Sequence, residues 1–84
     1  MHYVYVLQSE VDDQFYTSCT GDLRKRFQQH NDGNVLSTRD RRPLKLIYYE
    51  ACLNELDAFR REKYLKTTYG KRYIKVRCKN YFTG

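Results

Sequence analysis

Hydrophobic residues gather in three runs that predict the strands of a sheet. Residues 3–7 are aromatic or aliphatic without polar alternation, which is typical of a strand covered on both faces. Residues 14–18 resume strand character after the polar segment 10–13, so these two runs predict an antiparallel hairpin with a short loop. The third run, residues 44–52, follows Pro43, which excludes a continued helix and favours an extended backbone.

Between the second and third runs, the spacing becomes that of a helix. Asp22 is a good N-cap because its carboxylate can accept from the first free N–H groups, and Gly33 is the expected C-cap. Four residues fall on one face, at i, i+3, i+4 and i+7: Leu23, Arg26, Phe27 and His30. Two of these are apolar and belong against a core. The other two, Arg26 and His30, are unexpected on a face that packs against the core, because burying a charge without a partner is costly.

A second helix is predicted to begin after Asn54, a good N-cap, with Asp57 completing a weak capping box. We expect it to run to about Tyr69 and to end because Gly70 breaks it. One carboxylate, Glu62, is centred in the apolar stripe of this helix. The predicted inner face consists of Ala58, Phe59, Glu62, Leu65 and Tyr69.

The C-terminal segment fits two periods. Ile74, Val76 and Cys78 alternate with basic residues, as in a strand. A helical spacing is also met by four residues: Ile74, Cys78, Tyr81 and Phe82. A helix is the preferred interpretation. Together the segments predict a small antiparallel sheet flanked by helices, in a single α+β domain that covers residues 1–84.

Charge adds a first indication of the partner. The chain carries 16 Lys and Arg against 10 Asp and Glu, for a net charge of +6, and has nine tyrosines but no tryptophan. A basic surface with interleaved aromatic rings suits a phosphate backbone and exposed bases. The alternative is that the charge serves solubility and the tyrosines lie half-buried on the sheet. On charge alone, nucleic acid is only slightly favoured.

Several classes of protein are not expected. No apolar stretch is long enough to span a membrane, and no secretory leader is recognisable, so a cytoplasmic protein is expected. The three cysteines, Cys19, Cys52 and Cys78, form neither a CxxC pair nor a zinc spacing and are interpreted as small reduced core residues. With only two histidines, a structural zinc site is not expected either.

Five side chains that could take part in catalysis lie on the predicted inner faces. Arg26 and His30 belong to the first helix, Glu62 to the second, and Tyr5 and Tyr16 to the hairpin. One interpretation is structural: a buried Arg–Glu pair, with the histidine bonded to a backbone carbonyl. However, an isolated ion pair stabilises a small core poorly. The same set suits phosphodiester cleavage, because Arg neutralises phosphoryl charge, a carboxylate holds a hard divalent cation, and Tyr or His moves a proton.

Six segments in a fixed order carry a resemblance that covers essentially the whole chain. They are Tyr3-Val4-Tyr5, Tyr16-Thr17-Ser18, the run from Asp22 to His30, the Ser37-Thr38 to Arg41-Arg42-Pro43 loop, Ile47-Tyr48-Tyr49-Glu50, and the segment from Arg61 to Lys66. Through them the chain resembles the GIY-YIG nucleases, especially small stand-alone bacterial members, and is similar to the N-terminal nuclease domain of the excision-repair endonuclease. The resemblance implies a three-stranded antiparallel sheet flanked by three helices, in the order β-β-α-β-α-α.

The resemblance also implies roles for the five residues. Glu62 would be the sole protein ligand to one Mg²⁺ or Mn²⁺ ion, and Arg26 would contact the scissile phosphate. Tyr5 and Tyr16 would orient or deprotonate the attacking water, with Tyr5 the preferred base. His30 would assist proton transfer or contact the phosphate.

The activity implied is that of a divalent-metal-dependent endonuclease acting on DNA, in repair or recombination, without an organic cofactor. RNA stays open as a substrate, and the oligomeric state is open. Candidate contacts to the nucleic-acid backbone are Arg41, Arg42, Lys66, Lys71 and Arg72.

Two positions depart from the family pattern. The second signature normally ends in glycine, where this chain has Ser18, and the tail helix commonly carries an asparagine where this chain has Val76. These departures support an alternative of a different class: a catalytically weakened or inactive nucleic-acid-binding module with the same fold. A third interpretation is a structural or protein-interaction domain, which would bind neither DNA nor RNA.

Overall fold

The computed structural model describes all residues from 1 to 84. Its elements are β1 (His2–Ser9), β2 (Phe15–Thr20), α1 (Leu23–Asn31), β3 (Leu44–Cys52), α2 (Glu55–Leu65), α3 (Thr68–Arg77) and α4 (Lys79–Thr83). A single 3₁₀ turn, Arg39–Arg41, precedes β3. This is the expected α+β fold, and none of its helices has the length and apolar character needed to cross a membrane.

The sheet has three antiparallel strands in the order β2-β1-β3, so β1 is central. Its residues Val4, Tyr5, Val6 and Leu7 have no exposed surface, which confirms the prediction of a strand covered on both faces. In the register, Tyr5 lies opposite Ser18 of β2 on one side and opposite Tyr49 of β3 on the other.

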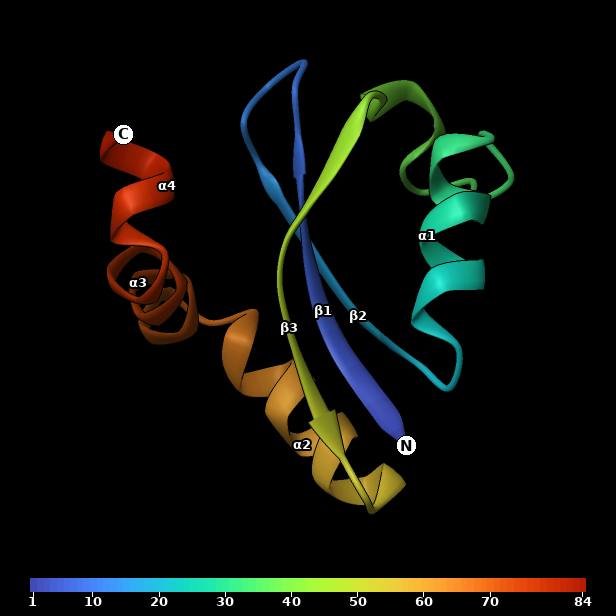
Figure 1. Cartoon of the computed structure of the whole chain (residues 1–84), viewed down its shortest axis with the longest axis vertical. Helices are drawn as coiled ribbons and strands as arrows, with labels where there is room; N and C mark the ends of the chain where they lie inside the picture. Colours follow the sequence, from blue (N-terminus) through green and yellow to red (C-terminus); the bar gives the residue numbers. More distant parts are fainter.

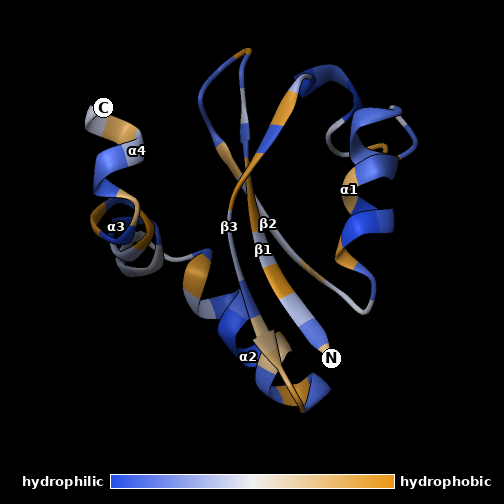
Figure 2. Ribbon diagram, in the orientation of Figure 1, coloured by the Kyte–Doolittle hydropathy of each residue, from blue (hydrophilic) through white to orange (hydrophobic).

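Helices cover both faces of this sheet. Figure 1 shows α1 on one side, and α2, α3 and α4 on the other. Successive β1 residues point to opposite faces, so each face acquires its own core. Val4 and Val6 pack with the α2 and α3 side, whereas Tyr5 and Leu7 pack with the α1 side. Figure 2 accordingly shows hydrophobic residues along β1, while α1 and α2 are mostly hydrophilic.

The first helix is confirmed, except that its C-cap is Asp32 and not Gly33. The Asp22 carboxylate accepts a hydrogen bond from the Lys25 backbone N–H at 3.1 Å and caps the N-terminus of α1. The helix ends at Asn31, and Gly33 follows in the left-handed region, with φ of 80°. Leu23 and Phe27 pack against the core on this side of the sheet, as their spacing predicts.

The predicted end of the second helix is wrong. The α2 helix ends at Leu65, and Thr67 begins a new helix, α3, by accepting from the Gly70 backbone N–H at 3.1 Å. Gly70 is therefore part of a helix and does not break one. It is buried where α3 packs against the end of α2, and a Cβ there would collide with the Tyr64 carbonyl oxygen.

The prediction for the inner face of α2 is wrong at two positions. Ala58 and Leu65 are buried as expected. Phe59, inside α2, is 46% exposed, so the buried stripe is narrower than predicted. Tyr69 is 70% exposed because the chain turns after Leu65 and this residue belongs to α3.

The C-terminal segment is helical, as the preferred interpretation had it. It forms two helices rather than one, because α3 ends at Arg77 and the next residue, Cys78, leaves the helical conformation with φ and ψ of −103° and 30° before α4 begins. The sheet is thus flanked by four helices, one more than expected. All three cysteines are free thiols of intermediate burial.

A polar cluster ties α2 to β3 on the face away from α1. Arg61 donates to both carboxylate oxygens of Glu50 at 2.9–3.0 Å, and its guanidinium lies 4.8 Å from the centre of the Tyr73 ring. The Tyr48 hydroxyl donates to the same carboxylate at 2.8 Å. These bonds orient α2, the helix that carries Glu62.

Candidate functional site

A buried chain of hydrogen bonds crosses the α1 side of the sheet. The Tyr5 hydroxyl lies 2.8 Å from Nε2 of His30, and Nδ1 of His30 lies 2.8 Å from Oγ1 of Thr38. The Thr38 hydroxyl in turn donates to the Val35 carbonyl at 3.5 Å. Tyr5, His30 and Thr38 have no exposed surface.

The hydrogen bond from Thr38 to the Val35 carbonyl favours one tautomer of the histidine. Because the Thr38 proton is directed to Val35, the Thr38 oxygen is left to accept from Nδ1–H of His30. Nε2 then carries a lone pair and accepts from the Tyr5 hydroxyl. Burial, together with the positive charge of Arg26, lowers the pKa of His30 to about 4, so the imidazole is neutral at neutral pH.

Tyr5 itself is a neutral phenol in this setting. Burial raises its pKa above the usual 10, while Arg26 and the Ser18 hydroxyl act in the opposite direction. Ser18, at the position that departs from the family glycine, lies directly opposite Tyr5 in the strand register.

Tyr16 and Arg26 stand closer to the surface of the same cluster. The Tyr16 ring packs edge-on against His30, with ring centroids 5.3 Å apart, and its hydroxyl accepts from Ser37 Oγ at 3.4 Å. Arg26 is partly buried and donates to the Gln29 side chain at 3.3 Å. Both side chains retain exposed surface, unlike Tyr5 and His30.

Glu62 approaches from the other face of the sheet, around the edge strand β2. Its side chain is 19% exposed and pairs with Lys66 one turn later, with Nζ and Oε2 2.6 Å apart. Burial opposes ionisation of Glu62, but Lys66 and the Cys19 thiol outweigh it and lower the pKa of the carboxyl. Burial and the adjacent Glu62 raise the pKa of Cys19 to about 12, so its thiol stays protonated.

The structure therefore brings the five predicted residues to one edge, in two groups. Tyr5, Tyr16, Arg26 and His30 form a contiguous cluster between α1 and the sheet, and Glu62 lies beyond β2. The partners that the structural interpretation assigned to these residues are wrong. Glu62 pairs with Lys66 instead of Arg26, and His30 bonds to two side-chain hydroxyls instead of a backbone carbonyl.

Comparison with known proteins identifies the family. The model of the GIY-YIG catalytic domain matches residues 1–75. The chain belongs to the GIY-YIG family. Among its relatives, a UPF0213 protein of Clostridium perfringens is 43% identical over 67 residues, covering 79% of this chain and 71% of that protein. A UPF0213 protein of Staphylococcus saprophyticus is 33% identical over 76 residues, covering 89% and 92%.

A solved structure agrees with the fold. The solution NMR structure of a UPF0213 protein from Bacillus halodurans has a TM-score of 0.55 and 32% identity, and the match covers 87% of this chain and 80% of that one. The resemblance to small stand-alone bacterial GIY-YIG proteins is thus confirmed. It places the chain in a nuclease family, whose substrates are nucleic acids.

GIY-YIG nucleases generally use divalent metals, so the fit of Glu62 to a cation matters. No group of three or more His, Cys, Asp or Glu side chains is placed to hold a metal ion. Mg²⁺ keeps several waters and is often bound through one or two carboxylates. A single ionised, partly buried carboxylate therefore fits such an ion, provided that Lys66 gives up its contact.

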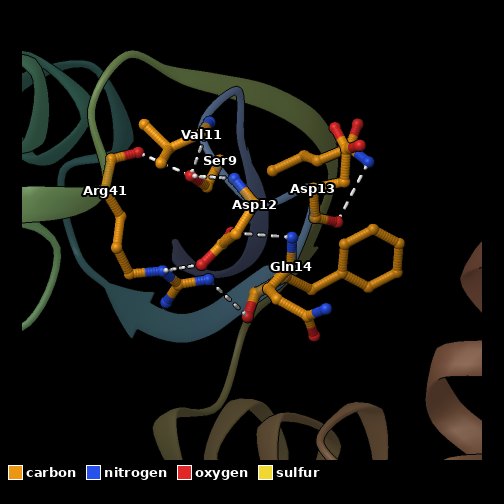
Figure 3. Close-up of polar contacts among 8 residues, drawn as sticks. Ser9, Val11, Asp12, Asp13, Gln14 and Arg41 are labelled. Carbon is orange, nitrogen blue, oxygen red and sulfur yellow. Dashed lines mark hydrogen bonds and ion pairs between the residues drawn. The ribbon is translucent and has the colours of Figure 1, made fainter.

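Arg41 is engaged within the protein. Figure 3 shows its guanidinium reaching the β1–β2 hairpin loop, where Nε pairs with Asp12 at 3.6 Å and Nη2 donates to the Phe15 carbonyl at 3.5 Å. Its own carbonyl accepts from Ser9 Oγ at 2.7 Å. Arg41 thus joins the segment before β3 to the hairpin.

The other predicted backbone contacts are scattered. Arg42 is exposed but donates to the Arg39 carbonyl at 2.9 Å, and Lys66 is paired with Glu62. Lys71 and Arg72 are exposed on α3, on the side of the sheet away from α1. Lys66 is the one of the five that adjoins the cluster, where Tyr16 and Cys19 contribute to its raised pKa after Glu62.

Thr38 is the residue that sequence reasoning missed. It lies in the segment before the 3₁₀ turn, where no periodicity marks a side chain as inward-facing. The one available signal was its place in the Ser37-Thr38 element of the family pattern. Val76, the second departure, is 70% exposed on α3.

Proposed function

We propose that this protein is a divalent-metal-dependent endonuclease that hydrolyses phosphodiester bonds in DNA, in repair or recombination in the cytoplasm. The observation that supports this most directly is the oriented hydrogen-bond chain from Tyr5 through neutral His30 to Thr38, placed behind the exposed parts of Tyr16 and Arg26. A fully satisfied buried network of hydrogen bonds rigidifies its surroundings, so this one holds Tyr5 and His30 in fixed positions behind Tyr16 and Arg26.

The geometry separates an exposed pair, Tyr16 and Arg26, from a buried pair, Tyr5 and His30. Tyr16 and Arg26 have exposed surface, so they can contact the attacking water and the scissile phosphate, where the guanidinium neutralises developing charge. Tyr5 was the preferred base, but its complete burial argues against direct contact with the substrate. Its hydroxyl donates to His30 and positions the ring behind Tyr16. Because the pKa of Tyr5 is raised and that of His30 is lowered, the proton stays on the phenol.

Glu62 would hold the cation. One Mg²⁺ or Mn²⁺ there, with water and substrate oxygens completing its shell, would supply Lewis-acid stabilisation of the phosphate charge. The depressed pKa of Glu62 keeps the carboxylate ionised and available for this role.

Cleavage assays on the purified protein test the proposal. We expect nicking of plasmid or cutting of branched and flapped DNA with Mn²⁺, none with EDTA, and a loss of at least about 100-fold for Glu62→Ala. Glu55→Ala, an exposed carboxylate on the same helix, is the matched control and should cut like the wild type. Absence of any cleavage, or equal cutting by Glu62→Ala, would contradict the proposal, and an RNA strand of the same length tests the choice of DNA.

A second candidate function rests on the Lys66–Glu62 pair. With Nζ 2.6 Å from the carboxylate, the lysine occupies the position a cation would take. A nucleic-acid-binding module that has lost catalysis would keep this pair, together with Ser18 in place of glycine. It would bind DNA in a salt-sensitive manner without any dependence on metal. Metal-dependent nicking that disappears in Glu62→Ala would rule it out.

A further inference from the structure

A second concave surface lies on the flank of α1 away from β2. It is a pocket of about 480 Å³ between the N-terminal turn of α1 and the outer strand β3. The proposed mechanism does not use it, although Tyr3 and Tyr49 belong to segments of the family pattern. Its main lining residues are Tyr3, Leu23, Arg24, Phe27, Leu46 and Tyr49.

Aromatic rings form one wall of this pocket. Tyr3 and Tyr49 lie on neighbouring strands with ring centroids 6.2 Å apart and planes inclined at 63°. Tyr49 is 55% exposed, which leaves much of its ring open to the pocket. Phe27 and Leu46 supply an apolar surface beside it. An open ring bordered by apolar side chains is the kind of surface on which a nucleobase stacks.

Positive charge connects this pocket to the candidate site. Arg24, Lys25 and Arg26 are consecutive in the first turn of α1, which contains no acidic residue. Successive helical residues are rotated by about 100°, so the three side chains fan from one flank of the helix to the other. Arg26 belongs to the cluster with Tyr5 and His30, whereas Arg24 lines the aromatic pocket.

The surface between the two is continuous. Lys25 and Arg26 line a hollow beside β2, and Asp22 borders both that hollow and the aromatic pocket. The Asp22 carboxylate accepts from the Lys25 backbone N–H, and its single negative charge is outnumbered by the positive charges of Arg24, Lys25 and Arg26. A phosphate backbone that leaves Arg26 can therefore cross the first turn of α1 over Lys25 and reach Arg24.

We infer that the Tyr3–Tyr49 pocket binds an unstacked nucleobase of single-stranded DNA whose backbone crosses the first turn of α1. The path from Arg26 rests on the proposed nuclease function. Bases inside a continuous duplex stack on each other and cannot enter such a pocket, so the substrate class is DNA with a single-stranded segment beside the cleaved bond. Stacking tolerates any base, which gives preference for structure without preference for sequence.

Binding measurements on the Glu62→Ala protein, in EDTA, separate this pocket from catalysis. Fluorescence anisotropy with a labelled oligothymidylate should show about tenfold weaker binding when Tyr49→Ala is added, as loss of one stacked base predicts. Tyr49→Phe keeps the ring and should restore the affinity. Tyr69→Ala removes an exposed tyrosine on α3 and should leave the affinity unchanged. A strand of abasic sites should bind more weakly and be insensitive to Tyr49→Ala.

Equal binding of the oligothymidylate by the Tyr49→Ala and parent proteins would overturn the inference, as would equal affinity for the abasic strand. Either result leaves the nuclease proposal intact if wild-type protein cuts DNA with Mn²⁺. Conversely, a Tyr49-dependent affinity in a protein that cuts nothing would uphold the pocket and reject the nuclease. Because Tyr49 is more than half exposed, its substitution is not expected to unfold the domain.

Discussion

At the scale of single residues, the site depends on the tautomer of one buried histidine. His30 accepts from Tyr5 only while Nδ1 carries the proton, and Thr38 is the group that keeps it there. An orienting partner of this kind sets which ring nitrogen is free to accept a proton. Thr38 thus acts through His30 and not on the substrate.

Thr38→Val removes the hydroxyl at nearly constant shape. It leaves the buried Nδ1–H of His30 without an acceptor, so we expect the free energy of unfolding to fall by about 1–3 kcal/mol. Nitrogen-15 NMR of the imidazole should show the Nδ1–H tautomer in wild type and a mixture of tautomers in the valine variant. Thr38→Ser should restore both the tautomer and the stability. A wild-type spectrum of the Nε2–H tautomer would contradict this orientation.

At the scale of elements, the caps were predictable and the junction of α2 and α3 was not. Asp22 and Asn54 precede apolar periodic runs, and both cap as expected. Thr67 caps α3 in the same way, but the general rule that glycine ends a helix drew attention to Gly70 instead. The reason for that glycine is tertiary, because it allows the backbone of α3 to approach the end of α2. Sequence alone does not reveal such an approach.

Gly70→Ala tests this close approach. Alanine is favoured over glycine in a helix by about 1 kcal/mol, so a helix with free space around it would be stabilised. Here the new methyl group would meet the Tyr64 carbonyl and the Leu65 backbone, and we expect a net destabilisation of about 1–2 kcal/mol. Thermal unfolding should show Tm lower by about 4–8 °C per kcal/mol. Gly21→Ala, where a Cβ meets nothing within 4 Å, is the control and should not lower Tm.

At the scale of the whole molecule, the sheet has one core on each face, and the candidate site residues are divided between these two faces. Arg26 and His30 belong to the α1 face, and Glu62 belongs to the α2 face. The helical period identified Arg26, His30 and Glu62 as inward-facing, and their faces of the sheet follow from which helix carries them. The edge strand β2, which lies between α1 and α2, is where the two groups can meet. The pairing of Glu62 with Lys66 follows an i, i+4 spacing visible in the sequence, whereas the buried state of Tyr5 required the central place of β1.

The burial of His30 makes the stability of the whole domain depend on pH. Its pKa of about 4 in the folded state lies below its usual 6.5, so the unfolded chain binds the extra proton first as pH falls. The stability gained from the neutral imidazole is fully present above about pH 6.5 and is lost as pH falls towards about 4, by roughly 3 kcal/mol. Carboxyls with depressed pKa, such as Glu62, contribute a separate loss at lower pH, below their usual 4.5.

Urea unfolding at a series of pH values measures this dependence. Wild type should lose stability between pH 6.5 and 4, whereas His30→Gln, although less stable overall, should have a flat profile from pH 6.5 to about 5, above the range where the carboxyls act. His2→Gln controls for the second histidine, which is partly exposed near Glu55, and should keep the wild-type slope. The difference between the His30→Gln and His2→Gln slopes isolates the buried imidazole. Parallel profiles for all three proteins would mean that His30 titrates like an exposed histidine. His30 would then not be the neutral acceptor of the hydrogen bond from Tyr5.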